Sequence, residues 1–222
     1  MKIITFTCDL YADAIPAYHY LWNSRWPNCP HEMIYVTNSK PLTVDATVHY
    51  LGCKEIEYGR RLRKFVALHC KDDEPGLFMM GDYLVRAVNA PLIERAREIC
   101  ERDDVAHVRL RPMPHPSLPP QIDLNKNIFG GIDRTKRYSL SLQPGIWNPK
   151  ALSRCVRDLW SAHQCELKGS GLTRKIKGHF LSVQRPAIIH LNYYKGRKPI
   201  GVEWVKKNVP KEFWPKAARR KK

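Results

Sequence analysis

The chain has 222 residues, of which 43% are hydrophobic and 10% are aromatic. This composition excludes a protein that is disordered over most of its length, and the length predicts one sizeable core or at most two small domains. No apolar run approaches the roughly 18 residues that a membrane-spanning helix needs. Asp9 and Asp13 interrupt the N-terminal stretch too early for a signal peptide. We therefore expect a globular cytoplasmic protein.

The formal net charge of +17 is concentrated in the last quarter of the chain. Residues 1–167 contain 22 basic and 19 acidic residues and net +3, whereas residues 168–222 contain 16 basic and two acidic residues and net +14. Residues 206–222 alone carry eight basic residues and one acidic residue. This charge predicts an anionic partner, and it predicts that the last segment is an extended basic arm.

The seven cysteines are scattered along the chain and form no C-x-x-C pair. A disulfide framework or a structural zinc site would show closer spacing. We expect reduced and mostly buried thiols.

Apolar periodicity predicts an alternation of strands and helices. The expected strands are 2–8, 33–37, 47–51, 76–80, 105–110, 138–142 and 187–191, and the expected helices are 13–25, 60–70, 90–102, 148–159 and 162–169. This alternation predicts an α/β fold with a mainly parallel central sheet flanked by helices. The proline-rich and glycine-rich stretch 112–135 interrupts it, and a loop of that length inside a compact domain is usually functional or mobile.

Several common catalytic motifs are missing from the sequence. The dinucleotide-binding glycine fingerprint, the P-loop, the G-x-S-x-G elbow and H-E-x-x-H do not occur. Their absence argues against most dehydrogenases, ATPases, serine hydrolases and zinc proteases.

A first candidate site is Asp82, which follows a buried apolar strand and precedes Tyr83. Ligands of open α/β sheets collect at the carboxyl ends of strands, where a carboxylate can hold a divalent cation or a ribose hydroxyl. The alternative is that Asp82 caps a helix or belongs to a turn.

A second candidate site combines Trp147 with Glu166. A tryptophan beside a sugar-sized pocket can stack on an apolar sugar face, and a carboxylate held near a hydroxyl can act as a general base. The alternative is a core tryptophan and a solvated helical glutamate.

A third candidate site lies at residues 188–197. An alternating strand places His190 and Asn192 on one face, and Lys195, Gly196 and Arg197 form a basic loop that suits a diphosphate. The alternative is a core histidine and a surface turn. The basic cluster around Arg61 and Lys64 could likewise bind phosphate or form a solvated helix face.

Four segments taken together resemble the small GT-A-type glycosyltransferases of bacteriophage genomes and bacterial surface-polysaccharide loci. The segments are FMMGDYL at 78–84, YSLSLQPGIW at 138–147, WSAHQCELKGS at 160–170 and IIHLNYYKGR at 188–197. The resemblance covers residues 1–200 and implies a GT-A-like domain over 1–205, followed by a basic C-terminal arm over 206–222. It also implies a nucleotide-sugar donor, such as a UDP-sugar of the UDP-glucose kind.

The resemblance also implies roles for individual residues. Asp82 and Glu166 are the implied catalytic residues, with Glu166 as the base of an inverting enzyme. The implied donor-binding residues are Thr7, Cys8, Asp9, Arg61, Lys64, Tyr83, Trp147, His190, Asn192, Lys195 and Arg197. Relatives carry two acidic residues where this chain has Gly81 and Asp82. Asp82 and His190 would therefore hold an Mn or Mg ion, or Lys195 and Arg197 would neutralise the leaving diphosphate without a metal.

The acceptor is predicted from the charge. Cations interleaved with aromatic residues are typical of contacts to a phosphate backbone and to stacked bases. We expect DNA with a hydroxymethylated base, extruded from the stack, as the acceptor, in the host cytoplasm if a phage encodes the chain. The expected contacts are Lys206, Lys207, Lys211, Trp214, Arg219 and Arg220. One alternative is a lipid-linked or cell-surface saccharide acceptor, with the arm on anionic lipid. A second alternative is a non-catalytic nucleic-acid-binding module.

Overall fold

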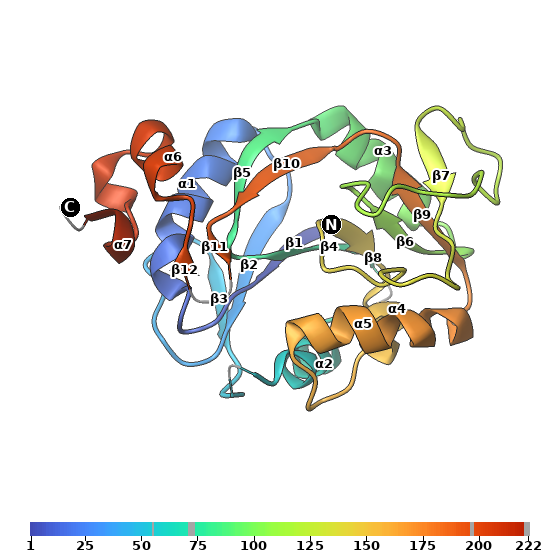
Figure 1. The fold of residues 1–222 in the computed structure, drawn as a ribbon, viewed down its shortest axis with the longest axis horizontal. Helices are drawn as coiled ribbons and strands as arrows, with labels where there is room; N and C mark the ends of the chain where they lie inside the picture. Colours follow the sequence, from blue (N-terminus) through green and yellow to red (C-terminus); the bar gives the residue numbers. More distant parts are fainter. Residues whose placement is uncertain (55, 71–73, 196–197, 220–222) are drawn as a thin grey trace.

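The computed structural model describes residues 1–54, 56–70, 74–195 and 198–219, and for Arg219 it describes the backbone only. One central sheet of eight strands organises the chain, in the order β3-β2-β1-β4-β8-β6-β9-β7 (Figure 1). Its strands are β1 (Lys2–Phe6), β2 (Glu32–Thr37), β3 (Thr47–Tyr50), β4 (Gly76–Met80), β6 (Val105–Arg109), β7 (Phe129–Gly131), β8 (Gly145–Trp147) and β9 (His179–Val183). Only β7 and β8 run antiparallel to the other described strands of this sheet, so the expected mainly parallel sheet is confirmed.

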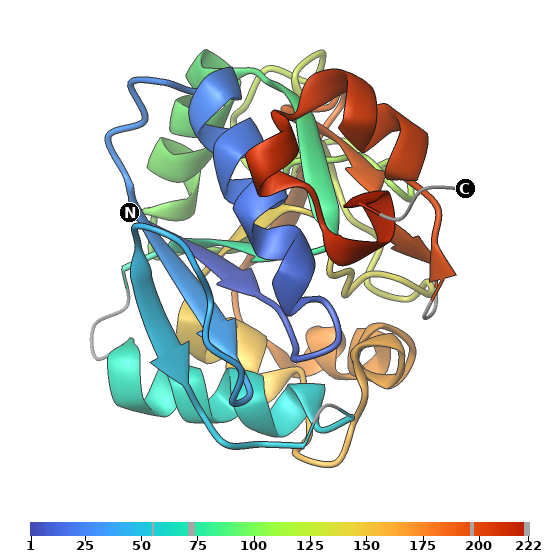
Figure 2. The same cartoon turned by 90° about the vertical axis from the view of Figure 1, so that its left-hand side faces the viewer.

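Helices cover both faces of the sheet and create two separate cores (Figure 2). On one face lie α1 (Ile15–Arg25) and α3 (Ala90–Cys100), and on the other lie α2 (Tyr58–His69), α4 (Pro149–Arg154) and α5 (Ala162–Leu172). Ile3 of β1 joins the first core and Ile4 joins the second, because successive side chains of a strand point to opposite faces. A strand buried on both faces is mostly apolar, as β1 is at Ile3, Ile4 and Phe6, and its buried Thr5 hydroxyl is hydrogen-bonded to Tyr18.

Side-chain caps set where three of these helices begin. The side chain of Asn89 accepts from the backbone N–H of Leu92 at the start of α3. Asn148 does the same for α4, and Ser161 forms a reciprocal capping box with Gln164 at the start of α5. These caps satisfy backbone N–H groups that have no partner inside the helix.

Two small antiparallel pairs stand beside the main sheet. β5 (Tyr83–Val88) pairs with β10 (Ile188–Asn192), which places Tyr83 opposite Asn192. β11 (Tyr194–Lys195) pairs with β12 (Lys198–Pro199). The first pair brings two chain segments that are about one hundred residues apart to the end of β4.

The C-terminal segment is helical and packed, so the expectation of an extended arm is wrong. It consists of α6 (Val202–Asn208), the 3-10 turn η3 (Lys211–Phe213) and α7 (Lys216–Arg219). Phe213 stacks on Tyr20 of α1 with ring centroids 5.2 Å apart, and Val205 is fully buried. Apolar residues spaced between the cations allow the segment to cover α1, which charge counting does not reveal. The boundary expected after residue 205 falls inside α6.

Other expectations need smaller corrections. Residues 138–142 form an irregular loop, buried from residue 139 onward, and not a strand; the helix expected over 148–159 ends at Arg154. The strands β5, β7, β8, β9, β11 and β12 were not expected. Short 3-10 turns occur at η1 (Ala12–Ala14) and η2 (Thr173–Lys175). No disulfide forms among the described residues, and five of the seven cysteines are buried. Within the described ranges, no helix has the length and apolarity needed to cross a bilayer.

Candidate active site

The candidate site begins where β1, β2 and β4 end together at one edge of the sheet. The backbone N–H of Gly81 donates to the carbonyl oxygen of Phe6 at 2.8 Å, and that of Thr7 donates to Val36 at 2.9 Å. The parallel register of β1 and β4 produces this meeting, because their carboxyl ends point the same way. Thr7, Asp9 and Asp82 are therefore gathered at one edge, as the sequence predicted.

Arg61 of α2 reaches this edge as a buried cation. It is 3% exposed, and its guanidinium donates to the side-chain oxygen of Asn38 after β2. Neither its Nε atom nor the Thr7 hydroxyl has a hydrogen-bond partner in the described part of the chain. Burial lowers the pKa of Arg61 against the opposing effect of Cys8 and other neighbours. Buried donors without partners are costly unless an anion or a ligand completes them.

The side chains of Asp9 and Lys64 form hydrogen bonds that hold two neighbouring loops in place. The Asp9 carboxylate accepts from the backbone N–H groups of Ser39 and Lys40, at 3.0 and 2.9 Å, and from the Ser39 hydroxyl. Burial opposes ionisation of Asp9, but these hydrogen bonds prevail and lower its pKa. The Lys64 ammonium donates to the carbonyl oxygen of Leu51 at 2.8 Å. Both residues therefore shape the rim of the site through the loops that follow β2 and β3.

Asp82, Tyr83 and His190 form the centre of the site. The His190 ring is stacked on Tyr83, with ring centroids 4.1 Å apart and an interplanar angle of 10°. Burial raises the pKa of Asp82 to about 6. Burial also raises the pKa of Tyr83 well above its ordinary value; Asp82 and Glu166 add to this effect and Arg111 opposes it. The phenol of Tyr83 is therefore influenced by two carboxylates, Asp82 and Glu166, and by the guanidinium of Arg111.

Arg111 and Gln143 complete this centre, and the sequence reasoning did not identify them. Arg111 Nη1 lies 2.7 Å from Nε2 of His190 and 3.4 Å from the side-chain oxygen of Gln143. Gln143 Oε1 lies 3.0 Å from the same ring nitrogen of His190. The two residues come from the proline-rich loop after β6 and from the S-L-Q segment. The unusual composition of these two segments is the feature of the sequence from which Arg111 and Gln143 could have been identified.

Arg109 forms hydrogen bonds with both of these segments, the proline-rich loop after β6 and the S-L-Q segment. It is 1% exposed at the end of β6, and it donates to the carbonyl oxygens of Pro114, Tyr138 and Ser139. Burial lowers its pKa to about 10, and the nearby charge of Glu166 acts in the opposite direction. Arg109 therefore fixes the backbone on which Arg111 and Gln143 are presented.

Glu166 approaches the site from α5 through the same loop. Its Oε1 atom accepts from the backbone N–H of Leu142 at 2.8 Å and from the Ser141 hydroxyl at 3.1 Å. The carboxylate is thus held in a defined orientation by the two residues that precede Gln143. A base must be oriented in this way before it can accept a proton from a substrate hydroxyl.

Trp147 does not line a pocket, so its assignment to the sugar site needs correction. It is 2% exposed at the end of β8 and stacks on His107, with ring centroids 3.6 Å apart. Phe180 meets it edge-on at 5.6 Å. The alternating pattern of β8 points this ring into the core beneath α4 and α5, as the structural alternative had it.

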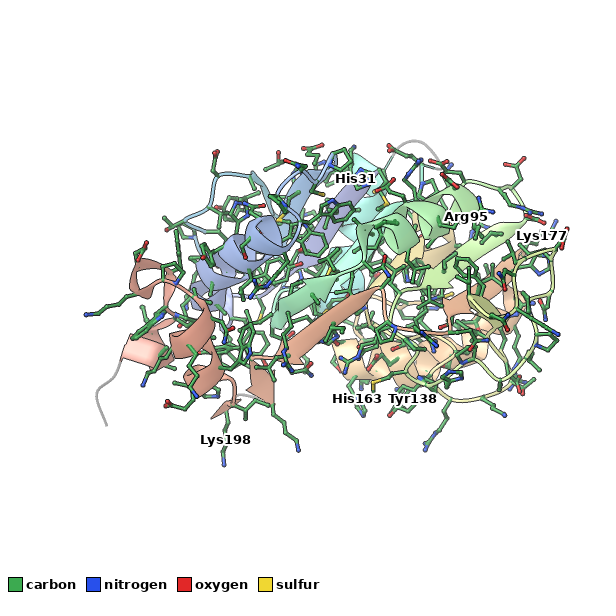
Figure 3. All side chains as sticks on the ribbon, turned by 90° about the horizontal axis from the view of Figure 1, so that it is seen from above. His31, Arg95, Tyr138, His163, Lys177 and Lys198 are labelled. Carbon is green, nitrogen blue, oxygen red and sulfur yellow. The ribbon has the colours of Figure 1, made fainter. Side chains whose placement is uncertain are left out.

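Other predicted residues lie around the centre or outside the description. Asn192 and Lys195 are exposed on β10 and β11, with Asn192 opposite Tyr83. Lys198, on β12, projects outward beside them (Figure 3). Arg197 and Arg220 lie outside the described residues, as does the side chain of Arg219.

The predicted acceptor residues are divided between packing and solvent. Lys207 and Lys211 are exposed, whereas Lys206 lies 3.5 Å from Glu203 in an ion pair. The Trp214 indole donates to the carbonyl oxygen of Val209 and is partly buried against the core. Trp214 therefore holds the C-terminal segment and does not present a free stacking face.

The described residues do not fit the Mn or Mg ion expected at Asp82 and His190. In the part of the chain that the structure describes, no three His, Cys, Asp or Glu side chains gather at a place that could hold a metal ion. The Arg111 guanidinium lies against the edge of His190 that carries both ring nitrogens, at 2.7 and 3.3 Å. A Cβ atom at Gly81 would lie 2.7 Å from Ile15 Cδ1 and 2.9 Å from Thr7 Cβ, so a second carboxylate cannot be added there without rearrangement.

Comparison with solved structures identifies the class of fold as that of the GT-A-type glycosyltransferases. No family model and no curated protein sequence matches the chain. S. aureus TarS 1-349 superimposes with a TM-score of 0.52 at 14% identity, over 85% of this chain and 59% of that one. The galactosyltransferase LgtC, in complex with donor and acceptor sugar analogues, gives 0.52 at 13% identity, over 96% of this chain and 99% of that one. TarS 1-349 in complex with UDP-GlcNAc gives 0.51 at 12% identity, over 88% and 60%. The chain thus spans about three fifths of the length of TarS 1-349.

Proposed function

We propose that this protein transfers a sugar from a nucleotide-sugar donor to an acceptor hydroxyl group. The observation that carries the proposal is the gathering of Asp82, Tyr83, His190, Arg111 and Glu166 at the carboxyl end of β4, where open α/β sheets bind ligands. The likeness in fold to LgtC with its donor analogue and to TarS with UDP-GlcNAc supports this proposal. A UDP-sugar is therefore the donor that we propose to test first.

The proposed donor site follows the carboxyl ends of β2, β1 and β4 in the central sheet and continues to β10 of the neighbouring pair. Arg61, Asn38 and Thr7 offer the nucleotide buried donors and acceptors after β1 and β2. Asp82 follows β4, which pairs with β1, and precedes Tyr83, on which the ring of His190 stacks. A carboxylate at this edge can hold a ribose hydroxyl. Lys195 is exposed on β11, which follows β10 in the chain.

The proposed reaction is attack of the acceptor oxygen on the anomeric carbon of the donor sugar. The new bond joins that carbon to the acceptor oxygen, and the bond from the carbon to the diphosphate oxygen breaks, with its electron pair leaving on the diphosphate. Glu166 takes the acceptor proton, which is the role of the base in an inverting enzyme. Its two hydrogen bonds from the 141–142 loop orient it for that step.

For the acceptor, we propose a hydroxymethylated base in DNA, on the strength of the charge. The segment 168–222 nets +14, and Lys195, Lys198, Lys207, Lys211 and Lys216 are exposed on it. Such a surface suits a phosphate backbone. Lys195 and Lys198 lie on β11 and β12, and Lys207, Lys211 and Lys216 lie on the packed C-terminal segment, so these cations belong to a folded surface.

A saccharide acceptor is the second candidate, and the acceptor sugar analogue bound to LgtC favours it. One experiment separates the two. Mass spectrometry follows hydroxymethylated DNA, unmodified DNA and an oligosaccharide panel after incubation with the protein and UDP-sugars. A hexose mass added only to hydroxymethylated DNA supports the DNA acceptor, and a mass added only to the oligosaccharides rejects it. No transfer and no hydrolysis of any nucleotide sugar would instead support the non-catalytic binding module.

A further inference from the structure

Arg111 is the one described cation whose guanidinium contacts both His190 and Gln143 in the site. It lies half-buried on the loop after β6, 2.7 Å from His190 Nε2 and 3.3 Å from its Nδ1. Among the described residues it forms no direct ion pair with a carboxylate; Asp82 and Glu166 act on the neighbouring Tyr83 without pairing with Arg111. A half-buried guanidinium without a direct ion-pair partner, close to a strand end, is suited to an anionic ligand.

The surroundings of Arg111 are built to present it. Arg109, two residues earlier, clamps the loop by donating to the carbonyl oxygens of Pro114 and Tyr138. The side-chain oxygen of Gln143, on the S-L-Q segment, lies 3.4 Å from Arg111 Nη1. The ring of Tyr83 stacks on the ring of His190. A fixed guanidinium costs little reorganisation when a negative charge develops in front of it.

The residues around Asp82 are correspondingly poor in metal ligands. Gly81 takes the position at which a second carboxylate would stand, and Ile15 and Thr7 leave no room for a side chain there. The edge of His190 that would face a cation already faces the positive charge of Arg111. A cation binding there would meet electrostatic repulsion in place of a ligand.

We propose that Arg111 neutralises the departing diphosphate and that sugar transfer by this protein does not depend on a divalent cation. The inference rests on the proposed glycosyltransferase function. As the bond from the anomeric carbon to the diphosphate breaks, the electron pair stays on the diphosphate oxygen, and the guanidinium of Arg111 donates to that oxygen. No metal ion takes part in this step, and the acceptor proton goes to Glu166 as above.

The test measures nucleotide binding apart from turnover. Isothermal titration calorimetry follows UDP, GDP, CDP and ADP in EDTA and again with added Mn²⁺, and each is compared with its nucleoside. Arg111→Gln and Arg111→Lys are the variants, and Arg95→Gln, an exposed arginine of α3, is the matched control. Thermal melting of each variant verifies the fold.

We expect the best nucleoside diphosphate to bind equally well in EDTA and in Mn²⁺. Arg111→Gln weakens that binding by about tenfold or more without changing nucleoside binding, because a charged hydrogen bond to phosphate is lost. Arg111→Lys recovers part of it, and Arg95→Gln changes nothing. The proposal is overturned if binding collapses in EDTA and Mn²⁺ restores it, or if folded Arg111→Gln binds normally. Either of these leaves the glycosyltransferase function standing. If no nucleoside diphosphate binds the wild type, the proposed function fails together with the inference.

Discussion

His190 lies flat on Tyr83, with 4.1 Å between ring centroids, while Arg111 Nη1 stands 2.7 Å from its Nε2 atom. Burial first, and the charge of Arg111 second, lower the pKa of His190 to about 3. The imidazole is therefore neutral at every pH at which the protein is expected to work. In this environment His190 acts as a hydrogen-bonding partner and not as a proton shuttle.

The first prediction concerns this neutral histidine. NMR of ¹⁵N-histidine-labelled protein should show a His190 ring signal that does not titrate between pH 5 and pH 8. In Arg111→Gln the pKa of His190 should move up towards its ordinary value, because one of the two causes is removed. A His190 signal that titrates near pH 6.5 in the wild type would contradict the arrangement.

The second prediction uses the raised pKa of Asp82, which burial brings to about 6. Between about pH 4 and pH 6 the folded state binds more protons at this site than the unfolded state, so the free energy of unfolding falls as pH rises through that window. Asp82→Asn should remove this loss and stabilise the protein by about 1–3 kcal/mol at pH 7.5 while abolishing turnover. Urea unfolding at pH 4 and pH 7.5 measures it. The idea fails if the variant is no more stable than the wild type at pH 7.5.

The third prediction concerns Gly81, where an added Cβ atom would meet Ile15 and Thr7 at 2.7 and 2.9 Å. Gly81→Ala should lower the free energy of unfolding by about 1–3 kcal/mol because the close approach of β4 to β1 must open. Gly171→Ala in α5 is the control, since nothing lies within 4 Å of its added Cβ atom. The control should be unchanged or stabilised by up to about 1 kcal/mol. Equal effects from both substitutions would show that the crowding at Gly81 is not decisive.

The fourth prediction separates the two roles open to Glu166. Glu166→Gln keeps an oxygen that accepts from Leu142 and Ser141, so its thermal stability should match the wild type. Its turnover should fall at least about 100-fold because an amide cannot take the acceptor proton. Glu166→Ala should lose both turnover and stability. Near-normal turnover in Glu166→Gln would reject the base and leave Glu166 as a residue that positions the loop.

The fifth prediction tests the proposed DNA surface without unfolding it. Deleting residues 206–222 would also remove Val209 and Phe213 from their packing on the core, so charge substitutions are the cleaner test. Lys207→Gln with Lys211→Gln should reduce the salt dependence of DNA binding by about two units of slope, one for each lost phosphate contact. Arg95→Gln with Arg102→Gln, two exposed arginines on α3 and just after it, removes the same charge and should leave the slope unchanged. An unchanged slope in the lysine pair would remove these residues from the acceptor surface.

Local sequence patterns were sufficient to predict the parallel strands β1 to β4 and β6 of the central sheet and the helices α1 to α5. The apolar run of β4 followed by Asp82 and Tyr83, and the alternation that brings His190 onto β10, both express short-range periodicity. These patterns placed the carboxyl edge of the sheet correctly, because parallel strands that alternate with helices end on the same side. They also predicted the mainly parallel sheet.

The tertiary structure alone decided which residues meet. Arg111 and Gln143 lie 79 and 47 residues from His190 on loops without periodicity, so no local pattern could join them. Trp147 and the aromatic residues of the C-terminal segment looked like ligand contacts. Burial against distant elements made Trp147 a core residue, and the C-terminal aromatics pack partly buried against the core. Composition and spacing report which side chains are available, whereas burial and charge pairing depend on what the remaining chain packs against them. For this reason the C-terminal segment, which we expected to be an extended arm, is folded against the core. For the same reason Arg111 lies against His190, where we expected a metal ion.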